Sequence, residues 1–433
     1  MDNTVSNLHW YMHPPRPFLS MVVGRRPSVA VRSIPHALCF ALIMIRPSAD
    51  SFAQATPISA HEDVRRYAEV IRQEHVDPFT CVSRQHFDSC AAALDERLSN
   101  EDRTGLLIGL LRLTAMLNDE HTMVRWNARL RLPIQVRTLD EDLCIIGTDS
   151  AHRPLLLHRV IAINDVPASS VLERFAALVK QDNPCYAAAW LGWNLCDVDL
   201  LMGLGIITDP EHVRLGLLDM EGDTVSAEVH SIDAQAVQWV RPASMCLQWA
   251  SRVKGNYGSL FDDSTSTLYV NYRRCREDEN ISMSAFTEEV FARIEAQHPA
   301  RLVIDLRENG GGSSALFMPF IKRLRKGYLN KENRIRVLIG RGTFSSAVMN
   351  AVELKRTTSA VLIGEVTGGN VNHYGEVREE ALPWSGFKVL YSTKHWVNWP
   401  GVVGGLKPDE YVGPSIADVV NGSDAAIERA IDR

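Results

Sequence analysis

Hydrophobic residues recur at helical spacing in the first third of the chain. The pattern predicts three helices between residues 60 and 117, and the last one (106–117) is apolar enough to be the buried one. Ser59 and Glu62 stand three residues apart at the start, so we expect them to form a capping box. The helical part ends at N-D-E-H-T (118–122).

Between residues 130 and 240 the pattern changes to short strands. Residues 160–167, V-I-A-I-N-D-V-P, predict a strand, an Asn-Asp turn and the start of a second strand. An amphipathic helix is predicted over 169–180, and a hairpin over 213–229. These elements indicate a small mixed α/β module.

The last third of the chain alternates between strands and helices. Buried-strand patterns at 301–306, 335–340 and 359–364 are separated by helical patterns at 314–325 and 346–356. Such alternation predicts parallel strands joined by right-handed crossovers. In the first of these helices Pro319 should cause a kink or shift the start.

Ligands of parallel sheets bind beyond the carboxyl ends of the strands. Three stretches lie at those ends, namely E-N-G-G-G (308–312), T-F-S-S-A (343–347) and E-V-T-G-G-N (365–370). The glycines of the first could present amides to an oxyanion or form a plain flexible turn. A phosphate loop would need a following Gly-Lys-Ser/Thr, which is absent.

The serine pair at 345–346 precedes a predicted helix, where serine is a favoured N-cap. The same place suits a nucleophile, because free helix amides stabilise negative charge. Ser345 could attack a substrate while the Ser346 amide and a glycine amide, from Gly310 or Gly311, bind the oxyanion. The sequence pattern alone leaves capping and catalysis both open.

The first 55 residues differ from the rest. Arginines at 25, 26 and 32 precede a short apolar stretch (34–45) and an A-x-A site ending at Ala55, as in a secretory signal. Met21 is a candidate start of this signal, and a poorly ordered tail is the alternative.

The overall composition is that of an ordinary globular protein. The chain has 433 residues, 45% hydrophobic and 23% charged, which suggests two or three domains at about 150 residues each. A net charge of −6 without a basic cluster argues against nucleic-acid binding. After the signal no apolar run reaches the ~18 residues of a membrane span.

None of the eight cysteines forms a C-x-x-C pair, so zinc and thioredoxin-like sites are not indicated. Export would permit disulfides, with Cys81–Cys90 and Cys185–Cys196 as candidates, but buried unpaired thiols are the commoner state.

Several motifs together resemble the S41 family of serine peptidases. L-V-I-D-L-R-E-N-G-G-G (302–312), T-F-S-S-A and L-I-G-E-V-T-G-G follow one another as in that family. L-N-D-E-H-T (117–122) is similar to a motif of its tricorn-like branch, and G-L-K-P-D (405–409) to a late family motif.

The resemblance implies an α/β fold with a crotonase/ClpP-like catalytic β-α domain (241–433), an N-terminal helical domain (56–128) and a PDZ-like mixed α/β module (129–240). Residues 1–55 would be the N-terminal extension and signal peptide.

The resemblance also implies site residues. It places the nucleophile at Ser345, the oxyanion donors at Gly310 or Gly311 and Ser346, and the base at His121. Tail-specific peptidases of the family use a lysine instead, and Asn370 occupies that position here.

An acid should orient the base. Glu376 is the first candidate, with Glu365 and Asp409 as alternatives. Asn370, His373 and Tyr374 are candidates for substrate binding.

The sequence therefore predicts an exported serine peptidase, periplasmic or secreted, that cleaves peptides or unfolded protein segments without a metal or other cofactor. A non-catalytic peptide- or lipid-binding module on the same scaffold is the alternative. A third possibility is acyl-CoA chemistry of the crotonase kind, which export would disfavour.

Overall fold

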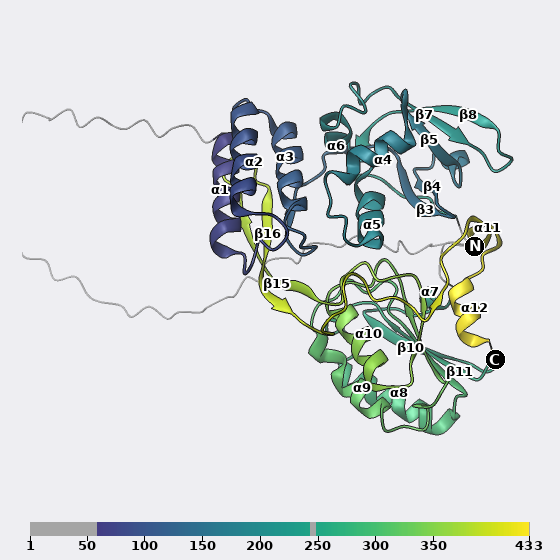
Figure 1. Cartoon of the computed structure of the whole chain (residues 1–433). Helices are drawn as coiled ribbons and strands as arrows, with labels where there is room; N and C mark the ends of the chain where they lie inside the picture. The colour runs from purple at the N-terminus through teal and green to yellow at the C-terminus, as the bar shows by residue number, and fades with distance from the viewer. Residues whose placement is uncertain (1–58, 243–247, 433) are drawn as a thin grey trace, which may run out of the picture. The chain divides into compact units, whose positions relative to one another are not determined.

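The structure is a computed structural model that describes residues 59–242 and 248–432 (Figure 1). The expected signal, with its start at Met21 and its cleavage after Ala55, lies outside the described residues, as does Cys246. Within the described ranges no helix has the length and apolarity that a membrane span requires.

Three helices open the described chain, as predicted: α1 (Ala60–Glu74), α2 (Arg84–Arg97) and α3 (Arg103–Ala115). Ser59 stands at the N-cap of α1 but its side chain makes no capping hydrogen bond, so the expected capping box is not formed. Glu62 instead pairs with Arg65 at 2.8 Å. Helix α3 is the most buried of the three, because apolar residues cover nearly its whole circumference.

The middle of the chain folds into an antiparallel sheet of order β3-β4-β5-β7-β8, with β6 beside β5. Its strands are β3 (Ile134–Leu139), β4 (Asp142–Thr148), β5 (Arg159–Ile163), β6 (Val166–Pro167), β7 (Val213–Leu218) and β8 (Thr224–Val229). The predicted hairpin over 213–229 is confirmed as β7 and β8. Strands β2 (Leu130–Arg131) and β9 (Ile232–Asp233) form a separate short pair.

Three helices accompany this sheet: α4 (Ala168–Ala176), α5 (Pro184–Asn194) and α6 (Val198–Gly203). The helix predicted over 169–180 thus ends at Ala176, and α5 and α6 were not predicted. In α5 the sequence P-C-Y-A-A-A-W-L-G-W-N has no polar face, so it carries no helical period.

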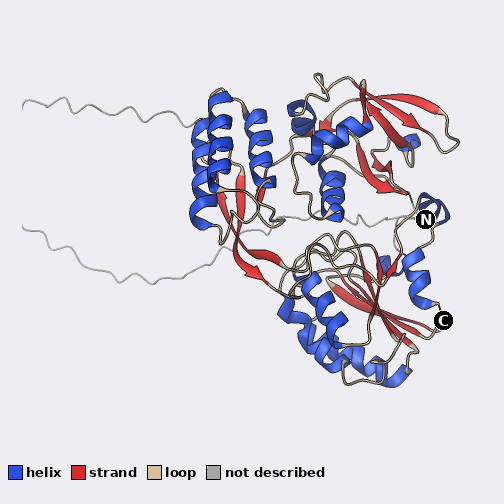
Figure 2. Cartoon of the chain, viewed as in Figure 1, coloured by secondary structure: helices blue, strands red, loops and turns tan. Residues whose placement is uncertain are grey.

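The predicted parallel sheet is confirmed (Figures 1 and 2). Its order is β10-β11-β12-β13-β14-β17, parallel except for the β10–β11 pair. The strands are β10 (Tyr257–Asp262), β11 (Thr267–Tyr272), β12 (Arg301–Asp305), β13 (Ile335–Ile339), β14 (Val361–Gly364) and β17 (Glu410–Tyr411).

Helices cover both faces of this sheet. On β12, Leu302 and Ile304 pack with α8 (Met283–Gln297), α9 (Met318–Leu324) and α10 (Ser346–Thr357), whereas Val303 packs with α12 (Ala425–Ile431) on the other face. Two short helices, α7 (Gln248–Ser251) and α11 (Ile416–Asn421), complete the set in the described ranges. Helix α9 begins at Met318, after a 3₁₀ turn over Ser314–Phe317, so Pro319 lies in its first turn and shifts the start as predicted.

A long hairpin, β15 (His373–Ala381) and β16 (Lys388–Trp396), extends from the parallel sheet to the first helices (Figure 1). Strand β1 (Met123–Arg125) pairs with β16. Phe387 and Val389 join the core formed by α1 to α3, and the Asp63 carboxylate accepts the Trp384 and Ser385 amides at 2.8 Å each. The helical part and the late hairpin therefore share one core, which the sequence pattern did not indicate.

The candidate disulfides are absent from the structure. Cys81, Cys90, Cys185 and Cys196 are all free thiols. Cys196 is buried, and desolvation raises its pKa, so it is an unreactive packing residue.

Candidate active site

Loops at the carboxyl ends of β12, β13 and β14 converge around Ser345. The Phe344 amide donates to the Asn309 carbonyl at 2.9 Å, which joins the serine turn to the loop after β12. The Gly369 amide donates to the Thr343 carbonyl at 3.0 Å, which joins it to the loop after β14. The three stretches that the sequence analysis singled out thus form one site.

Ser345 has an unusual backbone conformation. Its φ is 52° and its ψ is −126°, a combination that a non-glycine residue adopts only where the surrounding structure enforces it. It stands at the N-cap of α10, yet its side chain makes no capping hydrogen bond. Ser345 is partly exposed, and its hydroxyl makes no hydrogen bond to another described residue. The structure therefore does not support a capping role for this side chain.

Two glycines allow the close approach of these loops. Gly311 has a φ of +97°, and a Cβ there would lie 2.8 Å from the Ser345 Cβ. A Cβ on Gly369 would lie 2.9 Å from the Ser345 amide nitrogen. Any side chain at either position would displace the serine turn.

The structure distinguishes between the predicted oxyanion donors. The Gly311 amide already donates to Asn309 Oδ1 at 2.9 Å, so it is occupied. The amides of Gly310 and Ser346 have no acceptor among the described residues. Ser346 Oγ donates to the Gly312 carbonyl at 2.7 Å, which ties the start of α10 to the glycine loop.

His121 lies beside the serine turn. Its ring stacks on Phe344, with centroids 4.6 Å apart, and on His373 at 5.1 Å. The side chain is buried, and neither ring nitrogen has a hydrogen-bond partner among the described residues. Burial lowers the pKa of His121, although the charges of Glu120 and Asp119 oppose this shift. The imidazole is therefore neutral near neutral pH and has a free nitrogen.

The turn that carries His121 is fixed by Asp119. Its carboxylate accepts the His121 amide at 2.8 Å, the Thr122 hydroxyl at 2.6 Å and His75 Nε2 at 3.0 Å. His75 Nδ1 accepts the Asp77 amide, which makes Nε2 the donor toward Asp119. Burial would raise the pKa of Asp119, but the His75 hydrogen bond, the charge of His121 and the Thr122 hydrogen bond bring it well below its usual range.

Glu120 connects this turn to the middle module. Its carboxylate pairs with the Lys180 ammonium at 2.8 Å and accepts the Asn370 amide at 2.9 Å. Lys180 also pairs with Asp182 at 2.9 Å. The side chains of Lys180 and Glu120 are only 3% and 2% exposed. They therefore form a buried ion pair at the residue that precedes His121.

Asn370 is part of the same network. Its amide group donates to Asp182 at 2.8 Å and accepts from Asn183 at 3.0 Å. Both of its side-chain polar atoms are engaged with the middle module, so they face neither Ser345 nor a substrate in this state. Local sequence patterns do not indicate roles for Lys180, Asp182 and Asn183, because the site residues that they contact, Glu120 and Asn370, are distant in the sequence.

The three acids suggested as partners of His121 lie elsewhere. Glu376 is exposed, with a φ of 53°. Glu365 pairs with Arg341 at 2.7 Å, and Asp409 with Lys355 at 2.5 Å. None of them contacts His121 in the described structure, and stacking rather than a carboxylate orients the ring.

The carboxylates nearest to His121 are those of Asp119 and Glu120. Ligand atoms of these three residues lie within 4.8 Å of one another, as in a metal site. Both carboxylates are already engaged by buried donors, so a metal ion would have to displace the Lys180 ammonium or the Asp119 hydrogen bonds.

The other two substrate-binding candidates extend the aromatic stack. His373 is buried, and its Nδ1 donates to the Asn370 carbonyl at 2.8 Å. Tyr374 is half-buried, with its ring 5.5 Å from that of His75 and 4.6 Å from that of His395.

We expect loss of one partner of the buried Glu120–Lys180 pair to destabilise the protein strongly. In Lys180→Met the Glu120 carboxylate would remain buried without its counter-ion, which typically costs about 3–5 kcal/mol. The Lys355→Met control breaks the more exposed pair with Asp409, which should cost about 1 kcal/mol or less. Urea unfolding of both variants measures the difference, and equal losses would contradict the role assigned to burial.

Comparisons with known proteins identify the fold. No protein-family model matches the chain, and no curated protein does. Among solved structures, mature CPAF matches with a TM-score of 0.60 and 14% identity, over 86% of this chain and 95% of that one. Mature CPAF complexed with lactacystin matches with a TM-score of 0.59 and 13% identity, over 86% and 96%.

A photosystem II D1 C-terminal processing protease matches at 14% identity over 85% of this chain and 98% of that chain. Its TM-score is only 0.39, so we draw no structural conclusion from this match. The mixed α/β fold is that of S41-family peptidases, as the sequence motifs predict. At such low identity the likeness establishes the fold alone.

Proposed function

We propose that this chain is a serine peptidase that cleaves peptides or unfolded protein segments. The observation that carries the proposal is the position of His121, whose neutral ring stacks on the residue preceding Ser345 and keeps both nitrogens free. The shared fold and the ordered motifs of the S41 family support the same activity.

In the proposed reaction, His121 removes the proton from Ser345 Oγ as the oxygen attacks the scissile carbonyl carbon. The amides of Gly310 and Ser346 donate to the resulting oxyanion. The C–N bond then breaks as the His121 proton passes to the leaving amine. In the second half of the reaction, His121 removes a proton from water as the water attacks the acyl-enzyme. The same proton then returns to Ser345 Oγ as the acyl–oxygen bond breaks. For this transfer the His121 ring and Ser345 Oγ must come within hydrogen-bonding distance, since the ring makes no hydrogen bond in this state.

Two structural expectations belong to the proposal. The sheet of β3 to β8 acts as a PDZ-like module, and the β10–β14 sheet with α8 to α10 as a crotonase/ClpP-like catalytic domain. The module's Asn183 donates to the Thr367 and Gly368 carbonyls at 3.0 Å each, so a ligand on the module could influence the loop beside Ser345.

A non-catalytic binding protein is the second candidate. It is favoured by the replacement of the family lysine with Asn370 and by the absence of a carboxylate hydrogen-bonded to the His121 ring among the described residues. Hydrolysis of unfolded casein by the purified chain, compared with its Ser345→Ala variant, distinguishes the two. A substrate cut equally fast by both, or by neither, favours the binding protein.

We also propose that the protein is exported, on the evidence of the signal-like first 55 residues. The mature protein, isolated from the organism that produces it naturally, should then begin near Thr56. N-terminal sequencing of the purified protein measures this directly. A chain that keeps Met1 or Met21 and stays in the cytoplasm would contradict export and return acyl-CoA chemistry to consideration.

A further inference from the structure

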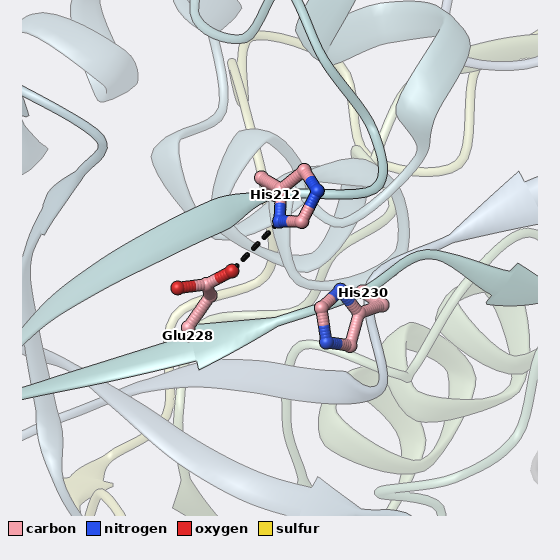
Figure 3. Close-up of side chains that lie close together, drawn as sticks. All are labelled: His212, Glu228 and His230. Carbon is pink, nitrogen blue, oxygen red and sulfur yellow. Dashed lines mark hydrogen bonds and ion pairs between the residues drawn. The ribbon is translucent and has the colours of Figure 1, made fainter.

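A cluster of possible metal ligands lies on the β7–β8 hairpin, on residues that the proposed peptidase site does not use. It consists of His212, which precedes β7, Glu228 on β8, and His230, which follows β8 (Figure 3). All three side chains are exposed.

The strand register places these side chains on one face. Val213 pairs with Val229 across the hairpin, and both are fully buried. One step further along the ladder, His212 stands opposite His230, and side chains there point away from the core because strand residues alternate. Glu228 lies two residues before His230, so its side chain shares that face.

The functional atoms of the three residues converge. One ligand atom from each lies within 4.8 Å of the other two. His212 Nδ1 lies 2.8 Å from Glu228 Oε1, and the two imidazole centroids are 5.6 Å apart (Figure 3). In a tetrahedral zinc site ligands stand roughly 3.4 Å apart, given bonds of about 2.0–2.1 Å. Exposed side chains can close the remaining gap by rotation.

The backbone beside His230 favours the tautomer that a metal ligand needs. His230 Nδ1 contacts the Glu211 carbonyl, which can only accept, so a neutral His230 ring would carry its proton on Nδ1. The lone pair of Nε2 is then free to coordinate. A backbone carbonyl that fixes the non-coordinating nitrogen is the usual outer partner of a metal-bound histidine.

The surrounding charge also favours a cation. The carboxylates of Asp209 and Glu211 act on His212 through their negative charge, and Glu228 pairs with His212 at 2.8 Å. This ion pair alone would account for His212 and Glu228. It does not account for a second imidazole directly opposite His212.

We propose that His212, Glu228 and His230 form a binding site for a divalent transition-metal ion, zinc by preference. Two imidazoles and one carboxylate are an established zinc ligand set and leave a fourth position open to water. The site shares no residue with the proposed peptidase machinery, so its failure and that of the peptidase proposal are separate results.

The test is calorimetric titration of the metal-free, tag-free protein with ZnCl₂ at neutral pH. We expect one equivalent to bind, and each of His230→Ala and Glu228→Gln to weaken that binding at least ~10-fold, the lower end of what even outer-shell substitutions cost. His298→Asn is the matched control. It removes an exposed histidine at a left-handed position that asparagine also tolerates, and should leave the affinity unchanged.

Two other places could bind zinc, and the same experiment separates them. Binding lost in His121→Ala but kept in His230→Ala would assign the ion to the Asp119–Glu120–His121 cluster and overturn the proposal. Titration with Co²⁺ would reveal thiolate ligation, for example by Cys90, through its charge-transfer absorption, which would also overturn it. The proposal would also be overturned if no heat of zinc binding is observed, or if His230→Ala and Glu228→Gln both bind zinc with unchanged affinity.

Discussion

Ser345→Ala should lose nearly all peptidase activity and remain folded. The substitution removes the uncommitted hydroxyl at the junction of the three loops, and no hydrogen bond of the described structure depends on it. Loss of the nucleophile in a serine peptidase typically costs on the order of 10⁴-fold or more in kcat. Casein hydrolysis measures the rate, and the thermal unfolding midpoint checks the fold. Activity equal to wild type would exclude Ser345 as the nucleophile.

The neighbouring Ser346 provides a matched control. Its hydroxyl donates to the Gly312 carbonyl, but its proposed catalytic group is the backbone amide, which Ser346→Ala retains. The lost hydrogen bond is worth about 0.5–1.5 kcal/mol, so the rate should fall by no more than ~10-fold. The opposite result, an inactive Ser346→Ala with an active Ser345→Ala, would assign the nucleophile to Ser346.

The centre of the parallel sheet was predictable because β12, β13 and β14 are buried on both faces over nearly their whole length. Their sequences are short apolar runs, such as L-V-I (302–304) and V-L-I (337–339), separated by segments of helical pattern. The convergence of three loops then follows from parallel topology, since the strands end at one edge. The position of Ser345 and the glycine loop could therefore be anticipated without coordinates.

The surroundings of His121 could not be predicted in the same way. The ion pair of Glu120 with Lys180 and the contact of Asn370 with Asn183 join segments 60 and 187 residues apart. Such contacts leave no local pattern, and a lysine at the end of a predicted helix is usually assigned to the surface. Glu376 was suggested as an orienting acid from its place in the sequence alone, whereas stacking between Phe344 and His373 needs the folded chain.

His121→Ala should lower kcat/KM by about 10²–10⁴-fold, the usual contribution of a general base. The four charged or titratable groups around the ring have opposing effects, since Glu120 and Asp119 raise its pKa whereas His373 and Lys180 lower it. Burial is the largest effect, so the pKa of His121 lies below the ordinary histidine value of about 6.5.

The pH profile tests this assignment more sharply than the loss of rate does. The base acts in its neutral form, so wild-type kcat/KM should hold as pH falls from neutral and decline only below about pH 6.5. A second group could produce an acid limb, because desolvation and the charge of Asp305 raise the pKa of Glu308, in the glycine loop, to about 7. Glu308→Gln separates the two, since it should leave the limb in place if His121 is the base. A limb centred near pH 7 that disappears in Glu308→Gln would instead assign the titration to Glu308 and remove the principal support for His121 as the proton acceptor.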